Sequence, residues 1–269
     1  MTFLDLENPG HAYLFGFLQA DGHLSQGIGR KGRLTVELSA RDAPILEAFQ
    51  RLCPYNSGIT YRTRATNFAT EHTSVQWTVC ALEFREELKA LGFPVGRKSL
   101  TVAPPKVPFV ERDYLRGLID ADGSVGRTAQ DLPFVSFTTQ SDALAAFSSR
   151  YFGELTDTRR VFRRNNRDAI YNIVFSREEA VAIALDLYYP GCLALPRKQA
   201  SADHAAAWVR PPGVKKVLRR SWSTEEDETL LAAGSAADAA GQLGRTVQSC
   251  SLRRWRLIGP KRPRAKSLG

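Results

Sequence analysis

The chain has 269 residues, of which 43% are hydrophobic and 24% are charged, the balance of a folded globular protein. No apolar run is long enough to cross a bilayer, and no basic stretch followed by an apolar one marks a secretory signal, so we expect an intracellular protein without a membrane partner. The four cysteines form no CxxC pair, which favours core thiols over a zinc site or a disulfide framework. The net charge of +9 favours nucleic acid as a partner.

The excess positive charge lies at the C-terminal end. Residues 210–269 hold 13 Lys and Arg against 5 Asp and Glu, whereas residues 1–209 have a net charge of only +1. A Pro-Pro-Gly stretch follows Arg210 at the boundary. This distribution predicts two modules, with a break near residues 209–213.

An internal repeat of about a hundred residues organises the first module. The segment YLFGFLQADG at 13–22 recurs as YLRGLIDADG at 114–123, which places Asp21 and Asp122 at an offset of 101. Two further landmarks keep an offset of 100: residues 39–42 match 139–142, and the Arg-Lys pair at 97–98 matches the pair at 197–198. Three matches at offsets of 100 or 101 imply a duplication.

Each copy predicts the same order of elements. A helix ends at Asp-Gly, and an alternating strand follows at 34–40 or 133–139. A helix comes next, at 43–52 or 142–152, and then two strands, at 58–65 and 74–81 or at 155–162 and 169–175. A closing helix ends near residue 91 or 189. The predicted fold class is therefore α+β: two pseudo-symmetric αββαββα repeats whose helices cover one face of antiparallel sheets and leave the other face free.

The repeated segment has a physical logic. Gly16 and Ala20 share one helix face, as Gly117 and Ala121 do, so the two helices can pack closely and bring their C-terminal ends together. Asp21 and Asp122 stand at those ends, each before a glycine able to adopt the left-handed cap conformation. Carboxylates there repel one another and the negative end of the helix dipole. A divalent cation would relieve this repulsion and could use the free carbonyls of Ala20 and Ala121; all-oxygen ligation suits Mg²⁺.

These residues resemble the LAGLIDADG motif of homing endonucleases, over about residues 10–205. The resemblance implies a saddle-shaped, metal-dependent endonuclease that cuts a long, specific double-stranded DNA site across the minor groove, with short 3′ overhangs. Asp21 and Asp122 would be the catalytic metal ligands, with Mg²⁺ as the cofactor and Mn²⁺ or Ca²⁺ able to substitute in binding. Because both copies lie on one chain, we expect a monomer. For either aspartate the plainer alternative is a helix-capping Asp-Gly turn.

The resemblance also implies supporting residues. Lys98 and Lys198 match the basic residue that the family places near the scissile phosphates, although a solvated lysine is an equal alternative. Gln140 matches a position that holds solvent near the metal, and Ala40 stands there in the first copy, so the two strands need not be cut at equal rates. The residues two positions before the catalytic pair, Gln19 and Asp120, are expected to be peripheral.

Basic side chains on strands and turns of the repeats are the expected DNA-reading surface, because arginine can contact guanine edges in the major groove. Solvated surface charge is the alternative. Residues 158–167 are expected to form a basic hairpin. The predicted DNA-binding residues of the repeats are Arg30, Arg33, Arg62, Arg64, Arg159, Arg160, Arg163, Arg164 and Arg167.

The C-terminal module predicts three short helices. A capping box at 223–226 begins the first, residues 236–243 form the second, and Thr246 caps the third. Trp222, Leu230, Leu243, Val247 and Trp255 are its expected core. The pattern is similar to Myb-like or helix-turn-helix domains, which implies recognition of the major groove, and a small protein-interaction bundle is the alternative. The predicted DNA-binding residues here are Lys215, Lys216, Arg219, Arg220, Gln248, Ser249, Arg253 and Arg254.

The expected organisation is thus repeat 1 (1–105), repeat 2 (106–209), a basic linker (210–220), a helix-turn-helix domain (221–258) and a basic tail (259–269). Two other functions stay open. A LAGLIDADG scaffold can serve as a DNA-binding regulator without cleavage, or as a maturase of intron RNA. Both aspartates and both lysines are present, which favours the endonuclease.

Overall fold

The computed structural model describes residues 3–25, 32–66, 69–158, 160–213 and 222–259. Among the residues expected to bind DNA, Arg30, Arg159, Lys215, Lys216, Arg219 and Arg220 lie outside these ranges, as does the basic tail. The chain divides into two compact units, Met1–Pro211 and Pro212–Gly269. No helix in the described ranges is long and apolar enough to cross a membrane.

The first repeat forms a four-stranded antiparallel sheet in the order β1-β2-β4-β3. Its elements are α1 (Pro9–Asp21), β1 (His23–Leu24), β2 (Leu34–Ser39), η2 (Ala40–Asp42), α2 (Ala43–Leu52), β3 (Ser57–Thr66), β4 (Ala69–Val79) and α3 (Leu82–Ala90). Helix α1 begins where the Asn8 side chain accepts hydrogen bonds from the backbone of Gly10 and His11, which satisfies two otherwise unpaired amides. The predicted strands and helices of this repeat are confirmed.

The second repeat has a three-stranded antiparallel sheet in the order β5-β6-β7. Its elements are α4 (Glu111–Asp122), β5 (Gly123–Arg127), β6 (Pro133–Thr139), α5 (Asp142–Thr156), β7 (Tyr171–Ser176), α6 (Glu178–Leu187) and α7 (Pro196–Ala206). Helix α7 was not among the predicted elements.

The strand predicted at 155–162 and the hairpin at 158–167 are wrong. Helix α5 continues to Thr156, and Asp157 ends it in the left-handed conformation with φ of 49°. Among the described residues that follow, only an isolated bridge joins Arg164 to Tyr171. The Thr156 hydroxyl donates to the carbonyl of Phe152 at 2.6 Å, and the amide of Thr158 donates to the carbonyl of Gly153 at 3.0 Å, so local hydrogen bonds accompany the extra turn of helix.

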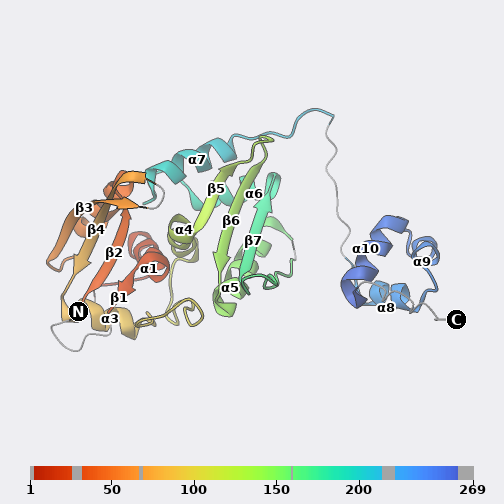
Figure 1. Ribbon diagram of the computed structural model, residues 1–269, viewed down its shortest axis with the longest axis horizontal. Coiled ribbons are helices and arrows are strands. Elements are labelled where there is room, and N and C mark those ends of the chain that lie inside the picture. The colour runs from red at the N-terminus through yellow and green to blue at the C-terminus, as the bar shows by residue number, and fades with distance from the viewer. Residues whose placement is uncertain (1–2, 26–31, 67–68, 159, 214–221, 260–269) are drawn as a thin grey trace. The chain divides into compact units, whose positions relative to one another are not determined.

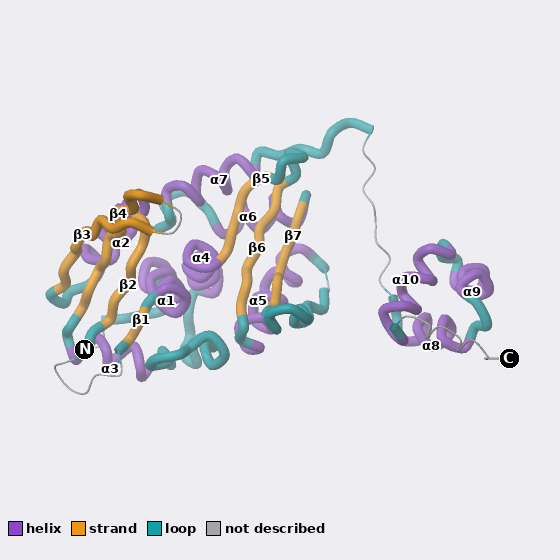
Figure 2. Tube along the Cα trace, viewed as in Figure 1, coloured by secondary structure: helices purple, strands orange, loops and turns teal. Residues whose placement is uncertain are grey.

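Helices α1 and α4 lie side by side between the two sheets (Figures 1 and 2). Burial alternates along the strands: Leu34 and Val36 of β2 are buried, whereas Glu37 is exposed, and β6 alternates in the same way. Each sheet therefore has an apolar face that contributes to the core and a more polar face. The predicted α+β fold of two related repeats is confirmed.

The C-terminal unit contains α8 (Thr224–Ala232), α9 (Ala236–Leu243) and α10 (Val247–Ile258). Ser223 and Glu226 form the predicted capping box, and Gly244 ends α9 with φ of 58°. The buried apolar core is Leu230, Ala233, Ala239, Ala240 and Cys250, with Trp222 and Leu243 packed against it.

Two residues expected in that core are not in it. Val247 and Trp255 are 51% and 58% exposed. Because α10 turns Cys250 inward and each residue rotates by about 100°, Trp255 comes to lie well away from the buried side. The predicted helix is confirmed, but it buries the side of Cys250 instead of the side that carries Val247 and Trp255.

Candidate active site

The two repeats meet through backbone contact between α1 and α4. A Cβ atom placed on Gly16 would lie 2.2 Å from the carbonyl oxygen of Tyr114, and one on Gly117 would lie 2.3 Å from that of Tyr13. Tyr13 and Tyr114 occupy the same place in the two repeats, so the contact is reciprocal. The predicted close approach of the helices at these glycines is confirmed, and it fixes where their C-terminal ends come together.

Asp21 and Asp122 are the last residues of α1 and α4. Both side chains keep exposed surface, yet surrounding residues of the same chain exclude enough water to raise the pKa of each carboxyl. Loss of solvation and then the charge of Asp122 raise the pKa of Asp21 to about 6. The two carboxylates therefore lie close enough to repel one another, as predicted.

The glycines after these aspartates do not adopt the expected left-handed cap. Gly22 has φ −72° and ψ 144°, and Gly123 has φ −104° and ψ −171°, both extended. A Cβ atom on Gly22 would instead lie 2.5 Å from the carbonyl oxygen of Leu18, and one on Gly123 would lie 2.6 Å from that of Ser136. The glycines are required by close packing at the helix end, because the chain enters a strand directly.

Lys98 and Lys198 each bind the carbonyl end of the helix in their own repeat. Lys98 Nζ donates to the oxygen of Leu18 at 3.0 Å and to that of Gly22. Lys198 Nζ donates to the carbonyl oxygens of Ile119 and Gly123, the same positions of the second repeat, at 2.5 and 2.9 Å. It also donates to the backbone carbonyl of Asp120 at 2.6 Å.

Partial burial lowers the pKa of both lysines. Loss of solvation lowers the pKa of Lys98 and of Lys198 to about 8, and the charges of Asp21 and Asp122 partly oppose this shift. Lys198 is the more enclosed, with 6% of its surface exposed. The alternative of freely solvated lysines is therefore wrong, and four charged groups form one electrostatic cluster at the helix ends.

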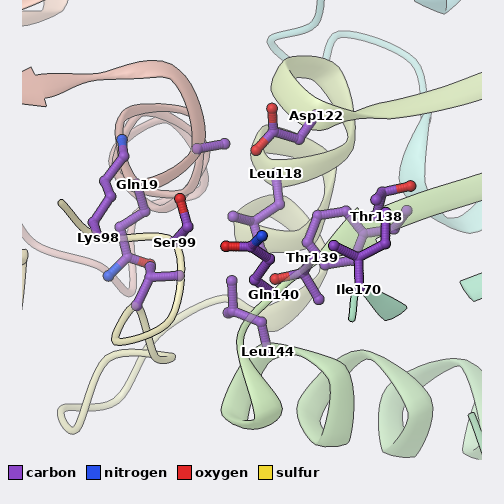
Figure 3. A pocket seen from close by; sticks show the side chains of 13 residues that line it. Gln19, Lys98, Ser99, Leu118, Asp122, Thr138, Thr139, Gln140, Leu144 and Ile170 are labelled. Atoms are coloured by element: carbon purple, nitrogen blue, oxygen red, sulfur yellow. The ribbon is translucent and has the colours of Figure 1, made fainter. Parts of the chain in front are cut away.

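A cleft of about 350 Å³ opens beside this cluster (Figure 3). Lys98 and Ser99 of the first repeat line it together with Asp122 and Gln140 of the second. Gln140 thus lies at the same opening as a catalytic candidate, as the sequence predicts. Its counterpart Ala40 begins η2 and has no side chain able to orient water.

The donor set at the helix ends suits a hard cation. In the described ranges no group of three or more His, Cys, Asp or Glu side chains could hold a metal, so two carboxylates are what the protein offers at this place. The lysines take neighbouring carbonyls and leave those of Ala20 and Ala121 to other partners. Two acids whose pKa values are both raised by loss of solvation, beside helix-end carbonyls, fit a divalent cation with oxygen ligands.

Gln19 and Asp120 are not peripheral. Each is only 1% exposed and lies at the interface of α1 and α4, hydrogen-bonded to the tyrosine of the other helix. The expectation rested on the motif position alone. Tyr13 and Tyr114 are also 101 residues apart, and this match is the sequence feature from which the cross-repeat bonds could have been predicted.

A second link between the repeats was also missed. Arg197 Nε donates to Asp42 Oδ1 at 2.9 Å, and Asp42 is buried. The corresponding Asp142 instead binds Arg164 and the hydroxyl of Tyr171. Arg97 remains exposed at a shallow hollow with His23.

The predicted DNA-reading arginines divide into exposed and internally paired groups. Arg33 and Arg62 are exposed, and Arg64 shares the exposed side of β3 while bonding Glu37 at 3.2 Å. Arg163 is exposed, and Arg167 is exposed beside Asp168.

Arg160 and Arg164 form the internally paired group. Arg160 pairs with Glu179 and bonds the carbonyl of Val174, while Arg164 bonds Asp142 and the carbonyls of Gln140 and Ala169. Without the predicted hairpin these side chains fold back on their own repeat. Both side chains are thus paired within their own repeat.

The predicted recognition residues of α10 divide in the same way. Arg253 forms a salt bridge with Asp227, and Arg254 donates to the carbonyl of Ala233 at 3.0 Å. Both connect α10 to α8 and the turn after it. Gln248 is exposed, and the backbone of Ser249 bonds the capping Thr246.

Comparison with known proteins places the chain in a family. The family model of the LAGLIDADG-like domain matches residues 9–89 and 109–186, which are more than half of the chain and include both helices of the site. The chain belongs to the LAGLIDADG-like family. The two matched segments correspond to the two repeats.

A stretch of 144 residues, 48% of this LAGLIDADG chain, is 31% identical to the tRNA-splicing ligase RtcB of Methanopyrus kandleri. The chain spans 14% of the length of that ligase. Among solved structures, the homing endonuclease I-WcaI bound to its DNA recognition sequence matches with a TM-score of 0.53 and 12% identity, over 75% of this chain and 88% of that one. I-DmoI in complex with DNA and Ca matches with a TM-score of 0.51 and 15% identity, over 74% and 100%. At these identities the likeness shows a shared fold.

Proposed function

We propose that this LAGLIDADG protein is a site-specific double-strand DNA endonuclease of the homing type. The observation that carries the proposal is the cluster at the helix ends: two mutually repelling carboxylates, each accompanied by a partly buried lysine of its own repeat. A merely structural capping turn has no use for this arrangement. Two related enzymes of the same fold have structures with DNA, one of them also with Ca, which supports DNA as the partner.

In this proposal Asp21 and Asp122 hold Mg²⁺ together with the carbonyls of Ala20 and Ala121, and Mn²⁺ or Ca²⁺ can replace it in binding. The bound ion supplies a water of lowered pKa and stabilises charge on the phosphate oxygens. Lys98 and Lys198 stand beside the carboxylates with pKa values near 8, so each can neutralise charge that develops on a phosphate at neutral pH. Gln140 orients water on its side of the cleft.

In this proposal each repeat acts on one DNA strand, because the two repeats are related by pseudo-symmetry. Cleavage across the minor groove would leave short 3′ overhangs, and one chain would act as a monomer because both half-sites are present. Arg33, Arg62 and Arg64, which are exposed, would contact the duplex, as would Arg163 and Arg167. Residues 1–105 and 106–209 would be the two half-site modules.

The C-terminal unit is proposed to be a Myb-like helix-turn-helix domain at 221–258 that extends the recognised site. Gln248 and Ser249 near the start of α10 would face the duplex, while linker residues 210–220 and the tail 259–269 add phosphate contacts and salt-dependent affinity. Ending the chain after Pro211 keeps the ion pair of Arg210 with Glu178 and should preserve cleavage while shortening the protected site. An unchanged footprint and affinity would argue against a DNA-reading role.

The test is selection of cleaved sequences from a randomised duplex library in Mg²⁺, with EDTA and the double variant Asp21→Asn/Asp122→Asn as controls. Recovery of one long site, cut on both strands only by the wild type with Mg²⁺, is the expected result. A site that is bound but never cut in Mg²⁺ or Mn²⁺ would indicate a regulator. Displacement of bound duplex by structured RNA at lower concentration than by DNA would indicate a maturase.

A further inference from the structure

The residues two positions before the paired aspartates form hydrogen bonds across the repeats. Tyr13 OH donates to Asp120 Oδ2 at 2.7 Å, and Tyr114 OH donates to Gln19 Oε1. All four side chains are buried. Since Tyr13 and Tyr114 are equivalent, as are Gln19 and Asp120, the helix interface contains the same polar bond twice, in opposite directions.

Asp120 also holds the segment that carries the lysine of its own repeat. Its Oδ2 accepts a hydrogen bond of 2.7 Å from the backbone amide of Leu195, the residue that caps α7, and its Oδ1 accepts one of 2.6 Å from Tyr188. The Leu195 carbonyl in turn accepts from the amide of Lys198 at 2.9 Å. A continuous path therefore runs from Tyr13 of the first repeat to Lys198 of the second.

Gln19 makes the corresponding link with fewer bonds. Its Nε2 donates to the carbonyl of Ala103 at 3.1 Å, at the end of a turn in which the Lys98 carbonyl accepts from the amides of Thr101 and Val102 at 2.9 and 2.8 Å. Ser141 Oγ also holds this loop by donating to the carbonyl of Val102 at 2.5 Å. The Gln19 side chain makes two hydrogen bonds, to Ala103 and Tyr114, whereas the carboxylate of Asp120 accepts three. The lysine of the second repeat is accordingly also the more buried.

We propose that Gln19 and Asp120 are positioning residues, each fixing the lysine of its own repeat against the helix end and coupling it to the other repeat through a tyrosine. A buried polar group at a helix interface could instead serve stability alone. The positions of the bonds argue otherwise, because each group reaches the lysine-bearing segment as well as the opposite helix. The positioning itself does not depend on the proposed function, but its catalytic consequence does.

The first experiment needs no DNA. Acylation of lysines by an excess of sulfo-N-hydroxysuccinimide acetate is followed by peptide mass spectrometry in the wild type and in Asp120→Asn. The Asn amide can keep its oxygen towards the Leu195 amide and turn its NH2 to the Tyr188 hydroxyl, but the bond to Leu195 loses the charge of the carboxylate. Lys198 should therefore react about fivefold faster, a factor typical of the difference between a charged and a neutral acceptor.

Asp186→Asn is the matched control. Asp186 lies on α6 and, like Asp120, accepts a hydrogen bond from a tyrosine hydroxyl, that of Tyr151 on α5 at 2.6 Å, away from the segment before Lys198. It should leave the Lys198 rate unchanged. An unchanged rate in Asp120→Asn, or an equal rise in both variants, would overturn the positioning role.

The second experiment measures nicking of each strand of the selected site. Asp120→Asn and Gln19→Glu should each slow one strand, and the slowed strands should be opposite, whereas Asp186→Asn should keep the wild-type ratio. If Asp120→Asn does not fold, Tyr13→Phe removes one bond of the same path and should shift the ratio in the same direction by less.

Equal slowing of both strands by every variant would show that Gln19 and Asp120 support only the fold, and would contradict the positioning role. If the wild type cuts no library sequence, the proposed endonuclease fails, and the acylation rates still decide whether Asp120 holds Lys198.

Discussion

Helix α1 and helix α4 keep the same contacts position by position, while the parts of the two repeats farther from them differ. Gly16 and Gly117 both meet a tyrosine carbonyl, and Lys98 and Lys198 both bind the last turn of their own helix. Beyond the interface the first repeat has four strands and the second has three. A Cβ atom at either glycine would overlap the backbone of the other helix, so the helix interface leaves no room for a larger residue, whereas the described sheets differ in their number of strands.

The helix-end aspartates test the similarity most strongly. Replacing either Asp21 or Asp122 by Asn should reduce double-strand cleavage by about 10²–10³-fold or more, the loss usual when a group that stabilises developing charge is removed. Duplex binding, measured by fluorescence anisotropy in Ca²⁺, should survive. Full double-strand cleavage by either variant would contradict a site shared between the repeats.

The glycines of the interface come next. Gly16→Ala and Gly117→Ala should each lower the free energy of unfolding by about 3 kcal/mol or more, because the added methyl meets backbone that has no flexible end to yield. Gly58→Ala is the control, since a Cβ atom there meets nothing within 4 Å. Urea unfolding measures all three, and a small effect at either interface glycine would mean that the helices can move apart.

The difference between Gln140 and Ala40 should appear as strand preference. Gln140→Ala should slow one strand by about tenfold, near the worth of one well-placed hydrogen bond, and let nicked DNA accumulate. The reciprocal Ala40→Gln should leave that strand unchanged. Supercoiled plasmid carrying the selected site reports nicked and linear products separately, and equal slowing of both strands would show that Gln140 acts on the fold.

The smallest expected effect is the change in Tm caused by the charge of Asp21. The pKa of Asp21 is raised in the folded chain from its ordinary 3.8 to about 6, so ionisation opposes folding above pH 6 and ceases to matter below about pH 4. In EDTA, Asp21→Asn should therefore raise Tm at pH 7.5 by about 1–2 °C, a modest gain because the side chain is exposed.

That gain should disappear as the pH falls through 6 towards 4. Thermal melting at several pH values checks it, with Asp203→Asn on the surface of α7 as the reference variant. A gain that persists at pH 4 would assign the effect to something other than the charge of Asp21.

Local pattern determined much of this protein. The repeat offset located both aspartates and both lysines, and small residues four apart predicted the helix contact, because a helix brings such residues onto one face. The capping residues of the C-terminal helices likewise follow from neighbouring sequence, since their bonds span only three positions.

Packing decided what the pattern left ambiguous. Residues 155–162 suit a strand locally, but α5 continues to Thr156, and Arg160 and Arg164 pair with Glu179 and Asp142 in place of the predicted hairpin. Gly22 and Gly123 are required by a crowded helix end rather than by a left-handed turn. Asp120 could not be assigned from the motif, because its partners Tyr13 and Leu195 lie 107 and 75 residues away and meet it only in the folded chain.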